Sequence, residues 1–231
     1  MKTESPPATS LQSVSIPADG VRLDGELCIP PNASAIVVFV HGSGSSRHSP
    51  RNQYVARILR QAGLATLLFD LLTKQEEAED EFTRHLRFDI ALLTRRLLEV
   101  AHWLRQRPGT AALPLAFFGA STGAAAALAA AAHLGEQVSA VVSRGGRPDL
   151  AGAALEKVHC PVLLIVGGKD EVVLQLTETA LEQLPGVKEL RIVAHASHLF
   201  EERGALEQVA QLAANWFRSH IPAPTSDGGF L

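Results

Sequence analysis

The chain has 231 residues, of which 46% are hydrophobic and 19% are charged, and its formal net charge is −3. These values fit one globular α/β domain, and the weak acidity and 5% aromatic content argue against a nucleic-acid or anionic-membrane partner. Two cysteines form no disulfide framework, residues 1–10 lack the apolar core of a secretion signal, and no apolar run is long enough to span a membrane, so we expect a cytoplasmic protein.

Apolar periodicity predicts alternating strands and helices after an N-terminal hairpin. The hairpin occupies residues 11–29 and turns at Asp19 and Gly20. Further strands are predicted at 36–40, 64–72, 113–118, 138–143, 161–166 and 188–194. Helices are predicted at 49–62, 81–107, 122–135, 148–157, 173–184 and 201–219. Repeated strand–helix units of this kind form a mostly parallel, doubly wound sheet with helices on both faces.

The same pattern predicts the domain organisation. Residues 11–221 are expected to form a single domain, because no linker or repeat interrupts them. Residues 1–10 are expected to be a flexible N-terminus, and residues 222–231, rich in Pro, Ser and Gly, a disordered tail. The acidic segment 76–81 is interpreted as a solvated loop that leads into the helix predicted at 81–107.

A serine stands at a sharp turn in the middle of the chain. The G-x-S-x-G segment 119–123 places Ser121 between a buried strand and an Ala-rich helix. Small residues on both sides let the chain turn tightly and push the hydroxyl out at the end of the sheet. A glycine-rich turn without chemistry would have the same composition, but the strand–turn–helix context favours a nucleophile.

An aspartate and a histidine follow later strands at the same edge of the sheet. Asp170 comes after one buried strand, and His195 and His198 come after the next. Ligands of open parallel sheets bind beyond the carboxyl ends of the strands, so these groups are expected to meet Ser121. A serine hydroxyl needs a neighbouring base to accept its proton, and a carboxylate orients that base. The chain order serine, aspartate, histidine is that of an α/β-hydrolase triad.

The base and the acid each have rivals. His195 lies nearer its strand end, whereas His198 precedes the last helix, where a loop can bring it over the serine. Asp70 follows its strand too early in the chain order. Asp149 follows the strand predicted at 138–143, where some hydrolases keep their acid.

The oxyanion of an acyl-transfer reaction needs two backbone donors. The N–H of Thr122 is one, because it opens the helix after the nucleophile. The second is predicted to be the N–H of Ser43, since Gly42 and Gly44 let that backbone approach closely. The loop also joins a strand to a helix as a phosphate cradle does, but it lacks the Gly-Lys-Ser/Thr ending of a P-loop.

These motifs together resemble the α/β-hydrolase superfamily and, within it, the dienelactone hydrolase-like family. The resemblance spans about residues 11–221 and is carried by segments 41–47, 119–123, 168–170 and 197–200. It implies an α/β-hydrolase fold with an N-terminal hairpin and no large lid domain. It also implies a triad of Ser121, Asp170 and His198 that uses no metal and no organic cofactor.

The chain departs from the family pattern at three places. Dienelactone hydrolases proper have a cysteine in the elbow where this chain has Ser121. They hold a glutamate in the loop that here contains His41, and an arginine just beyond the catalytic histidine, where Glu201 and Glu202 precede Arg203. The resemblance therefore implies the fold and the triad, whereas a neutral ester fits better than a dienelactone as the substrate.

The connection at 143–148 leaves no room for a large lid, so we expect an open, shallow site. Arg144 and Arg147 either line this site or are surface charges. The residues expected to contact substrate are His41, Gly42, Gly44, His48 and Arg144.

The sequence as a whole predicts a serine esterase that cleaves small or short-chain carboxylic esters through an acyl-enzyme. Its expected partner is a small-molecule ester, with no nucleic acid or membrane, and it is expected to be a monomer or homodimer. One alternative is a ligand-binding protein on a hydrolase fold without turnover. Another is a promiscuous hydrolase of phosphotriesters or lactones.

Overall fold

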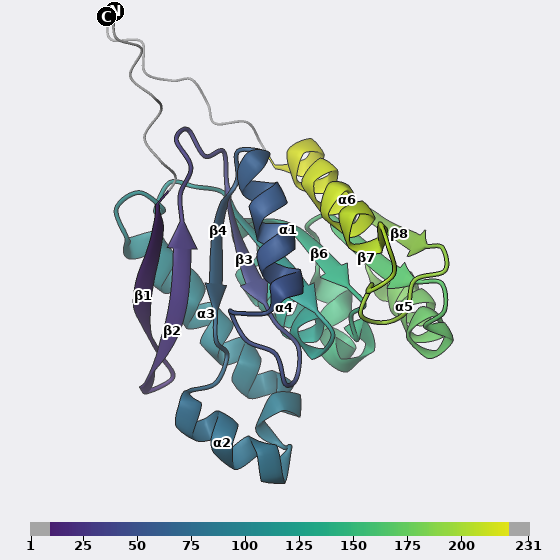
Figure 1. The fold of residues 1–231 in the computed structure, drawn as a ribbon, viewed down its shortest axis with the longest axis horizontal. Helices are drawn as coiled ribbons and strands as arrows, with labels where there is room; N and C mark the ends of the chain where they lie inside the picture. The colour runs from purple at the N-terminus through teal and green to yellow at the C-terminus, as the bar shows by residue number, and fades with distance from the viewer. Residues whose placement is uncertain (1–9, 222–231) are drawn as a thin grey trace, which may run out of the picture.

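The computed structural model describes residues 10–221, so the termini predicted to be flexible, 1–10 and 222–231, lie outside the described residues apart from Ser10. The core is an eight-stranded sheet with the order β1-β2-β4-β3-β5-β6-β7-β8 (Figure 1). β2 is antiparallel to both of its neighbours, and the remaining pairs are parallel. The predicted mostly parallel sheet is thereby confirmed.

The strands follow the predicted apolar runs closely. β1 and β2 turn at Asp19 and Gly20, whose φ values of 50° and 76° are those of a two-residue hairpin turn. All five residues of β3 are buried, as expected for a strand covered on both faces. The strands are β1 (Leu11–Ala18), β2 (Val21–Cys28), β3 (Ile36–Val40), β4 (Ala65–Phe69), β5 (Leu115–Ala120), β6 (Val138–Arg144), β7 (Val162–Gly167) and β8 (Lys188–Val193).

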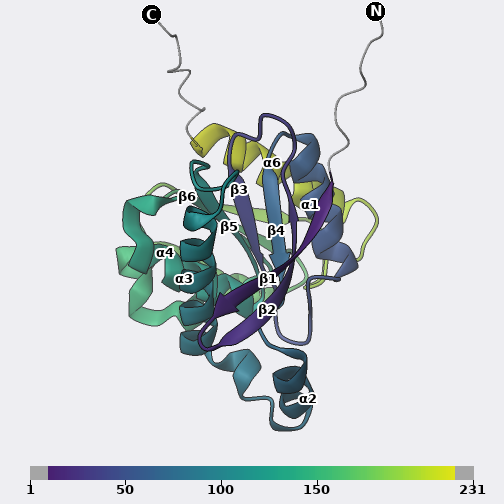
Figure 2. The ribbon, with the colours of Figure 1, turned by 90° about the vertical axis from the view of Figure 1, so that its left-hand side faces the viewer.

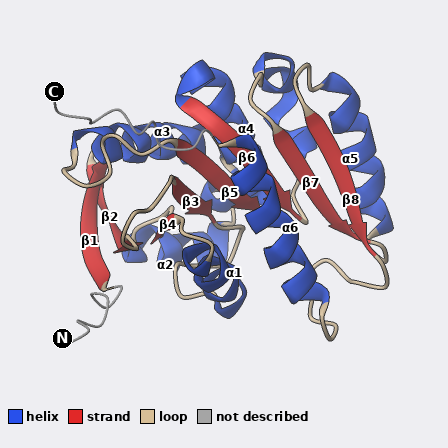
Figure 3. Cartoon of the chain, turned by 90° about the horizontal axis from the view of Figure 1, so that it is seen from above, coloured by secondary structure: helices blue, strands red, loops and turns tan. Residues whose placement is uncertain are grey.

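Helices cover both faces of the sheet (Figure 3). α1 (Pro50–Gln61) and α6 (Ala205–His220) pack on one face. On the other face lie α3 (Ile90–Gln106), α4 (Thr122–Leu134) and α5 (Glu171–Gln183). The short connections η2 (Gly135–Gln137) and η3 (Pro148–Lys157) are 3-10 helices. Within the described residues, no helix is long and apolar enough to cross a membrane.

The helix predicted at 81–107 is wrong at its beginning. The structure has three elements there: α2 (Lys74–Thr83), a single 3-10 turn η1 (Leu86–Phe88), and α3, which starts at Ile90. Thr73 and Glu76 form a capping box that starts α2, and Arg84 ends it in a left-handed conformation with φ 56°. The acidic segment 76–81 is thus helical, and α2 lies beyond the end of β4 (Figures 1 and 2).

Two buried arginine–carboxylate pairs fix this extra helix to the rest of the molecule. Arg96 of α3 is buried and donates to Glu76 at 2.9 Å and to the Leu71 carbonyl at 2.7 Å. Asp80, also buried, pairs with Arg87 and accepts the Leu86 N–H at 2.7 Å. The Arg96 and Arg87 side chains hold the pKa values of Glu76 and Asp80 below their usual range, although burial opposes this. Both ends of α2 are therefore anchored by charge-assisted hydrogen bonds.

α4 lies unusually close to the sheet because its residues are small. A Cβ on Gly123 would lie 2.1 Å from the Val40 carbonyl oxygen and 2.4 Å from that of His41. These atoms belong to backbone that is buried in the sheet and cannot move aside cheaply. Close packing at this point sets the position of the helix that follows Ser121.

We expect Gly123→Ala to destabilise the fold by about 3 kcal/mol or more, because the added methyl overlaps main-chain atoms. Gly168→Ala is the matched control, since its added Cβ would meet no atom nearer than 3.4 Å. Chemical denaturation of both variants measures the difference. Equal unfolding midpoints for Gly123→Ala and the wild type would contradict the packing described here.

Candidate active site

Ser121 lies at a strained turn between β5 and α4. Its φ of 50° and ψ of −126° are rare for a residue with a side chain. The turn is held by neighbouring backbone, because the Arg147 N–H donates to the Ser121 carbonyl at 3.1 Å. A Cβ on Gly42 would lie 2.7 Å from the Ser121 Cβ, so the loop after β3 passes directly over the serine. Only glycine at position 42 permits this approach.

Asp170 and His198 are joined by a short hydrogen bond. Asp170 Oδ2 lies 2.6 Å from His198 Nδ1, and the side chains are 15% and 39% exposed. The loops that carry them are tied together, since the Lys169 N–H donates to the Ala196 carbonyl at 2.9 Å. This geometry leaves the Nε2 atom of the ring free of the carboxylate, as a general base requires.

The His198 ring also lies close to the strand next to the serine turn. A Cβ on Gly145 would lie 3.6 Å from His198 Cε1. The preceding residue, Arg144, is the β6 partner of Ala120, which comes directly before Ser121. Within residues 10–221, no hydrogen bond joins Ser121 to His198. The serine and the Asp170–His198 pair therefore share one edge of the sheet without a hydrogen bond between them.

The rival acids have other partners. Asp70 accepts the Arg47 N–H at 2.7 Å and pairs with the Arg47 side chain. Asp149 is bound by Arg147 through two bonds of 2.8 and 2.7 Å. Both carboxylates are thus committed to arginines, whereas Asp170 faces a histidine.

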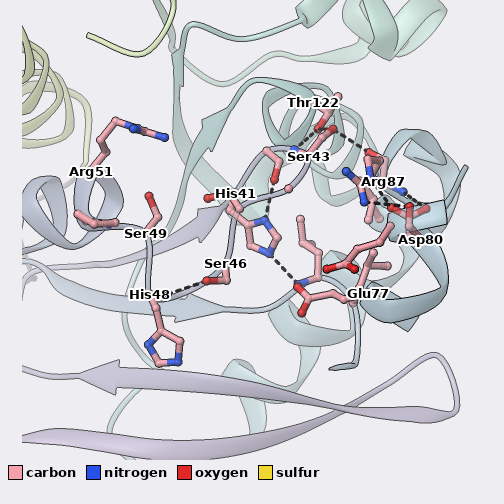
Figure 4. Close-up of a pocket in the computed structure, with 18 residues that line it drawn as sticks. His41, Ser43, Ser46, His48, Ser49, Arg51, Glu77, Asp80, Arg87 and Thr122 are labelled. Atoms are coloured by element: carbon pink, nitrogen blue, oxygen red, sulfur yellow. Dashed lines mark hydrogen bonds and ion pairs between the residues drawn. The ribbon is translucent and has the colours of Figure 1, made fainter. Parts of the chain in front are cut away.

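The predicted oxyanion donors contact one another. The Ser43 N–H donates to Thr122 Oγ1 at 3.1 Å, and the two hydroxyl oxygens lie 3.0 Å apart. Ser43 Oγ also lies 3.4 Å from the Arg87 carbonyl, which links the loop to η1 (Figure 4). The Ser43 N–H therefore already has an acceptor in this state.

His41 has a structural contact that the sequence did not predict. Its Nε2 accepts the Leu71 N–H at 3.0 Å, and its Nδ1 lies 2.9 Å from the Gly42 carbonyl oxygen (Figure 4). These two bonds fit a neutral ring that is protonated on Nδ1. Burial lowers the pKa of His41 below its usual value of about 6.5. The ring ties the loop after β3 to the segment that leads into α2.

His41 should make the fold less stable in mild acid. Below pH 6.5 the unfolded chain binds a proton at this position that the folded protein does not, so the stability falls as the pH drops from 7 to 5. His41→Gln keeps an acceptor for Leu71 but cannot titrate. We expect its loss of unfolding free energy over this range to be smaller by about 1 kcal/mol, measured by urea denaturation. Equal losses in both proteins would show that His41 titrates normally.

A cavity of about 620 Å³ runs along the loop after β3. Residues of α2 and η1 form one of its walls. In Figure 4, Ser49 and Arg51 lie at one end of the cavity, and Glu77, Asp80 and Arg87 lie at the other. Its lining residues are His41, Gly42, Ser43, Gly44, Ser45, Ser46, His48, Ser49, Pro50, Arg51, Leu71, Leu72, Glu77, Asp80, Glu81, Arg87, Leu93 and Thr122.

The predicted contact residues divide into two groups. His41, Gly42, Gly44 and His48 line the cavity, whereas Ser121, Asp170 and His198 do not belong to its lining. Arg144 does not belong to the lining and is buried beneath the loop that carries His198. The sequence missed the wall formed by α2 and η1, although the T-x-x-E spacing at 73–76 is a helix-start signal that would have separated α2 from α3.

Comparison with known proteins agrees with this fold. The alpha/beta hydrolase domain family matches residues 33–215. A crystal structure described as dienelactone hydrolase from Anabaena variabilis is 57% identical, with a TM-score of 0.91, and the match covers 93% of this chain and 99% of that one. The esterase Est1E from Butyrivibrio proteoclasticus is 17% identical with a TM-score of 0.75 over 90% of this chain and 98% of that one, and it supports the fold alone.

Two curated proteins from strains of Mycobacterium tuberculosis, both provisionally named phosphoribosyl transferase, are 55% identical over 217 residues. The match covers 94% of this chain and 48% of theirs, so the chain spans about half the length of these relatives. The family match over 33–215 and the identity to the Anabaena protein place this chain in the α/β-hydrolase superfamily, as a member of the dienelactone hydrolase-like family.

Proposed function

We propose that the protein is a serine esterase that cleaves carboxylic esters through an acyl-enzyme. The observation that carries the proposal is the 2.6 Å bond between Asp170 and His198, at the same sheet edge as the strained Ser121. A histidine oriented by a carboxylate can accept a serine proton during attack on a carbonyl. A side-chain rotation or a small loop movement has to bring His198 to the serine, as is common when a catalytic site tightens around substrate.

The reaction then follows from the roles of these three residues. Ser121 Oγ attacks the ester carbonyl carbon while its proton passes to His198 Nε2. The tetrahedral intermediate expels the alcohol, which takes that proton and leaves an acyl group on Ser121. Water attacks the acyl-enzyme and gives a proton to His198, which passes it to Ser121 Oγ as the carboxylic acid product leaves. Asp170 stabilises the imidazolium at each stage.

The oxyanion is bound by backbone N–H groups in this proposal. The Thr122 N–H is available at the start of α4, where helix N–H groups have no internal acceptor. The Ser43 N–H is the second donor. Its present acceptor is the Thr122 hydroxyl, so during the reaction it has to donate to the oxyanion instead, or to both acceptors at once. An anionic acceptor forms the stronger hydrogen bond, so the exchange is favourable once charge develops.

The proposal is tested by hydrolysis of 4-nitrophenyl acetate and by covalent labelling with a fluorophosphonate. We expect turnover by the wild type and a single adduct that peptide mass spectrometry locates on Ser121. A protein that binds esters without turnover and takes up no label would instead support a ligand-binding role on this fold. The relatives' name does not lead us to propose phosphoribosyl transfer, because the match covers only half of those chains.

A further inference from the structure

The end of the cavity formed by α1 is rich in hydrogen-bond donors. Ser45, Ser46, His48, Ser49 and Arg51 line it. Ser49 is the N-cap of α1, and Pro50 occupies its first turn. The Asn52 N–H donates to the Ser49 hydroxyl at 3.4 Å. Pro50 has no N–H and the Gln53 N–H donates to the Ser49 carbonyl, so the Arg51 N–H is the donor that this positive helix end leaves for an anion.

A buried arginine without an acidic partner reaches this helix end. Arg144 is only 7% exposed, and its Nη2 lies 3.5 Å from Asn52 Oδ1 in the first turn of α1. Its Nε has no hydrogen-bond partner, and its guanidinium lies 6.0 Å above the Phe200 ring. Among the described residues it forms no ion pair. A buried charge in this condition is costly unless an anion comes to balance it.

Arg51 adds a second positive charge at the same place. It lines the cavity, and its Nε is buried without a partner. In the described part of the chain its carboxylate partner is Glu201 at 3.3 Å, which is 65% exposed and belongs to the loop that carries His198. Burial, and after it the charge of Arg51, lowers the pKa of Arg144 to about 10. The two arginines thus lie close together, and among residues 10–221 the carboxylate paired with either of them is the exposed Glu201.

We propose that this end of the cavity binds a phosphate group, and that the natural substrate is an ester of a phosphorylated alcohol. The proposal rests on the serine esterase function and names its substrate class. A tetrahedral phosphate accepts hydrogen bonds from several directions, which suits a helix N-terminus, two serine hydroxyls and the Arg51 guanidinium, with the positive charge of Arg144 buried behind them. The same cavity continues to Gly42 and Thr122, the neighbours of Ser121, and in this proposal the ester of the bound molecule extends from there to the serine.

The loop after β3 thereby combines two functions. Its first half, at Gly42 and Ser43, approaches the nucleophile, and its second half, at Ser46 and Ser49, leads into α1. A P-loop ending is absent, as the sequence shows, and Arg51 and Arg144 supply the positive charge from α1 and β6 instead of a lysine in the loop. Arg144 acts from behind the first turn, and Arg51 from the cavity wall.

The test compares two substrates that differ only in a phosphate, monoacetin (1-acetylglycerol) and 1-acetylglycerol 3-phosphate. We expect the wild type to prefer the phosphorylated ester by about 10- to 100-fold in kcat/KM, the range of one or two charge-assisted hydrogen bonds. Arg144→Gln and Arg51→Gln should each reduce this ratio by about tenfold or more. Arg57→Gln removes a positive charge from the exposed side of the same helix and should leave the ratio unchanged.

The outcomes separate this proposal from the esterase function. No hydrolysis of either ester by the wild type would overturn the function itself. Equal hydrolysis of both esters would overturn only the phosphate site. Inorganic phosphate should inhibit competitively against the phosphorylated ester, whereas inhibition without any preference between the esters would identify a site for the free ion and would also overturn the proposal. Arg51→Gln, at a partly exposed position, provides the test if Arg144→Gln does not fold.

Discussion

Replacing Ser121 with alanine is expected to lower kcat for 4-nitrophenyl acetate by about 10⁴ to 10⁶, the range found when a triad nucleophile is removed. No other hydroxyl occupies the apex of the turn, where φ is 50°. Alanine keeps the Cβ and the backbone conformation, so the unfolding free energy should change by less than about 0.5 kcal/mol. Steady-state kinetics and chemical denaturation of the same preparation measure both quantities.

Ser139→Ala is the control for this variant. Ser139 belongs to β6 and is half-buried away from the turn. Its removal should leave kcat within about twofold of the wild type, because it touches no group in the proposed mechanism. Retention of wild-type kcat by Ser121→Ala would eliminate the acyl-enzyme mechanism, whatever the variant's stability.

Asp170→Asn should lower kcat by about 10⁴ with little change in KM. The amide removes the negative charge that stabilises the His198 imidazolium, and an amide N–H at the position of Oδ2, 2.6 Å from Nδ1, would favour the wrong tautomer of the ring. Initial rates over a series of substrate concentrations separate kcat from KM.

Asp149→Asn is the matched control for the acid, since Asp149 is the rival carboxylate and is held by Arg147. We expect it to keep kcat within about threefold of the wild type. If Asp149→Asn lost activity and Asp170→Asn did not, the proposed identity of the acid would be wrong.

The strands and the serine turn were predictable because their signals are local. β3 is a continuous β-branched and aromatic run, and the hairpin turn contains the Asp19–Gly20 pair that such turns favour. The position of Ser121, Asp170 and His198 after the ends of β5, β7 and β8 follows from the rule that ligands meet parallel sheets at their carboxyl edge. These inferences need no knowledge of side-chain packing.

The wall formed by α2 was not predicted, because apolar periodicity says little about a helix whose buried side is charged. Asp80 is buried, although an aspartate in an acidic segment is predicted to lie at the surface. The left-handed conformation of Arg84 turns the chain so that Arg87 can pair with Asp80. The role of His41 was missed for a related reason. Its partner, the Leu71 N–H, belongs to the loop after a different strand. Apolar periodicity does not predict which loops lie in contact.

α2 is held by the charged pairs on its inner side, while its outer side and the following turn leave Phe82 88% and Phe88 55% exposed. The outward residues contribute little to the anchoring and are free to change over evolution. Paralogues of this protein can therefore vary the outer surface of this short segment, while the charged pairs beneath it keep the helix in place.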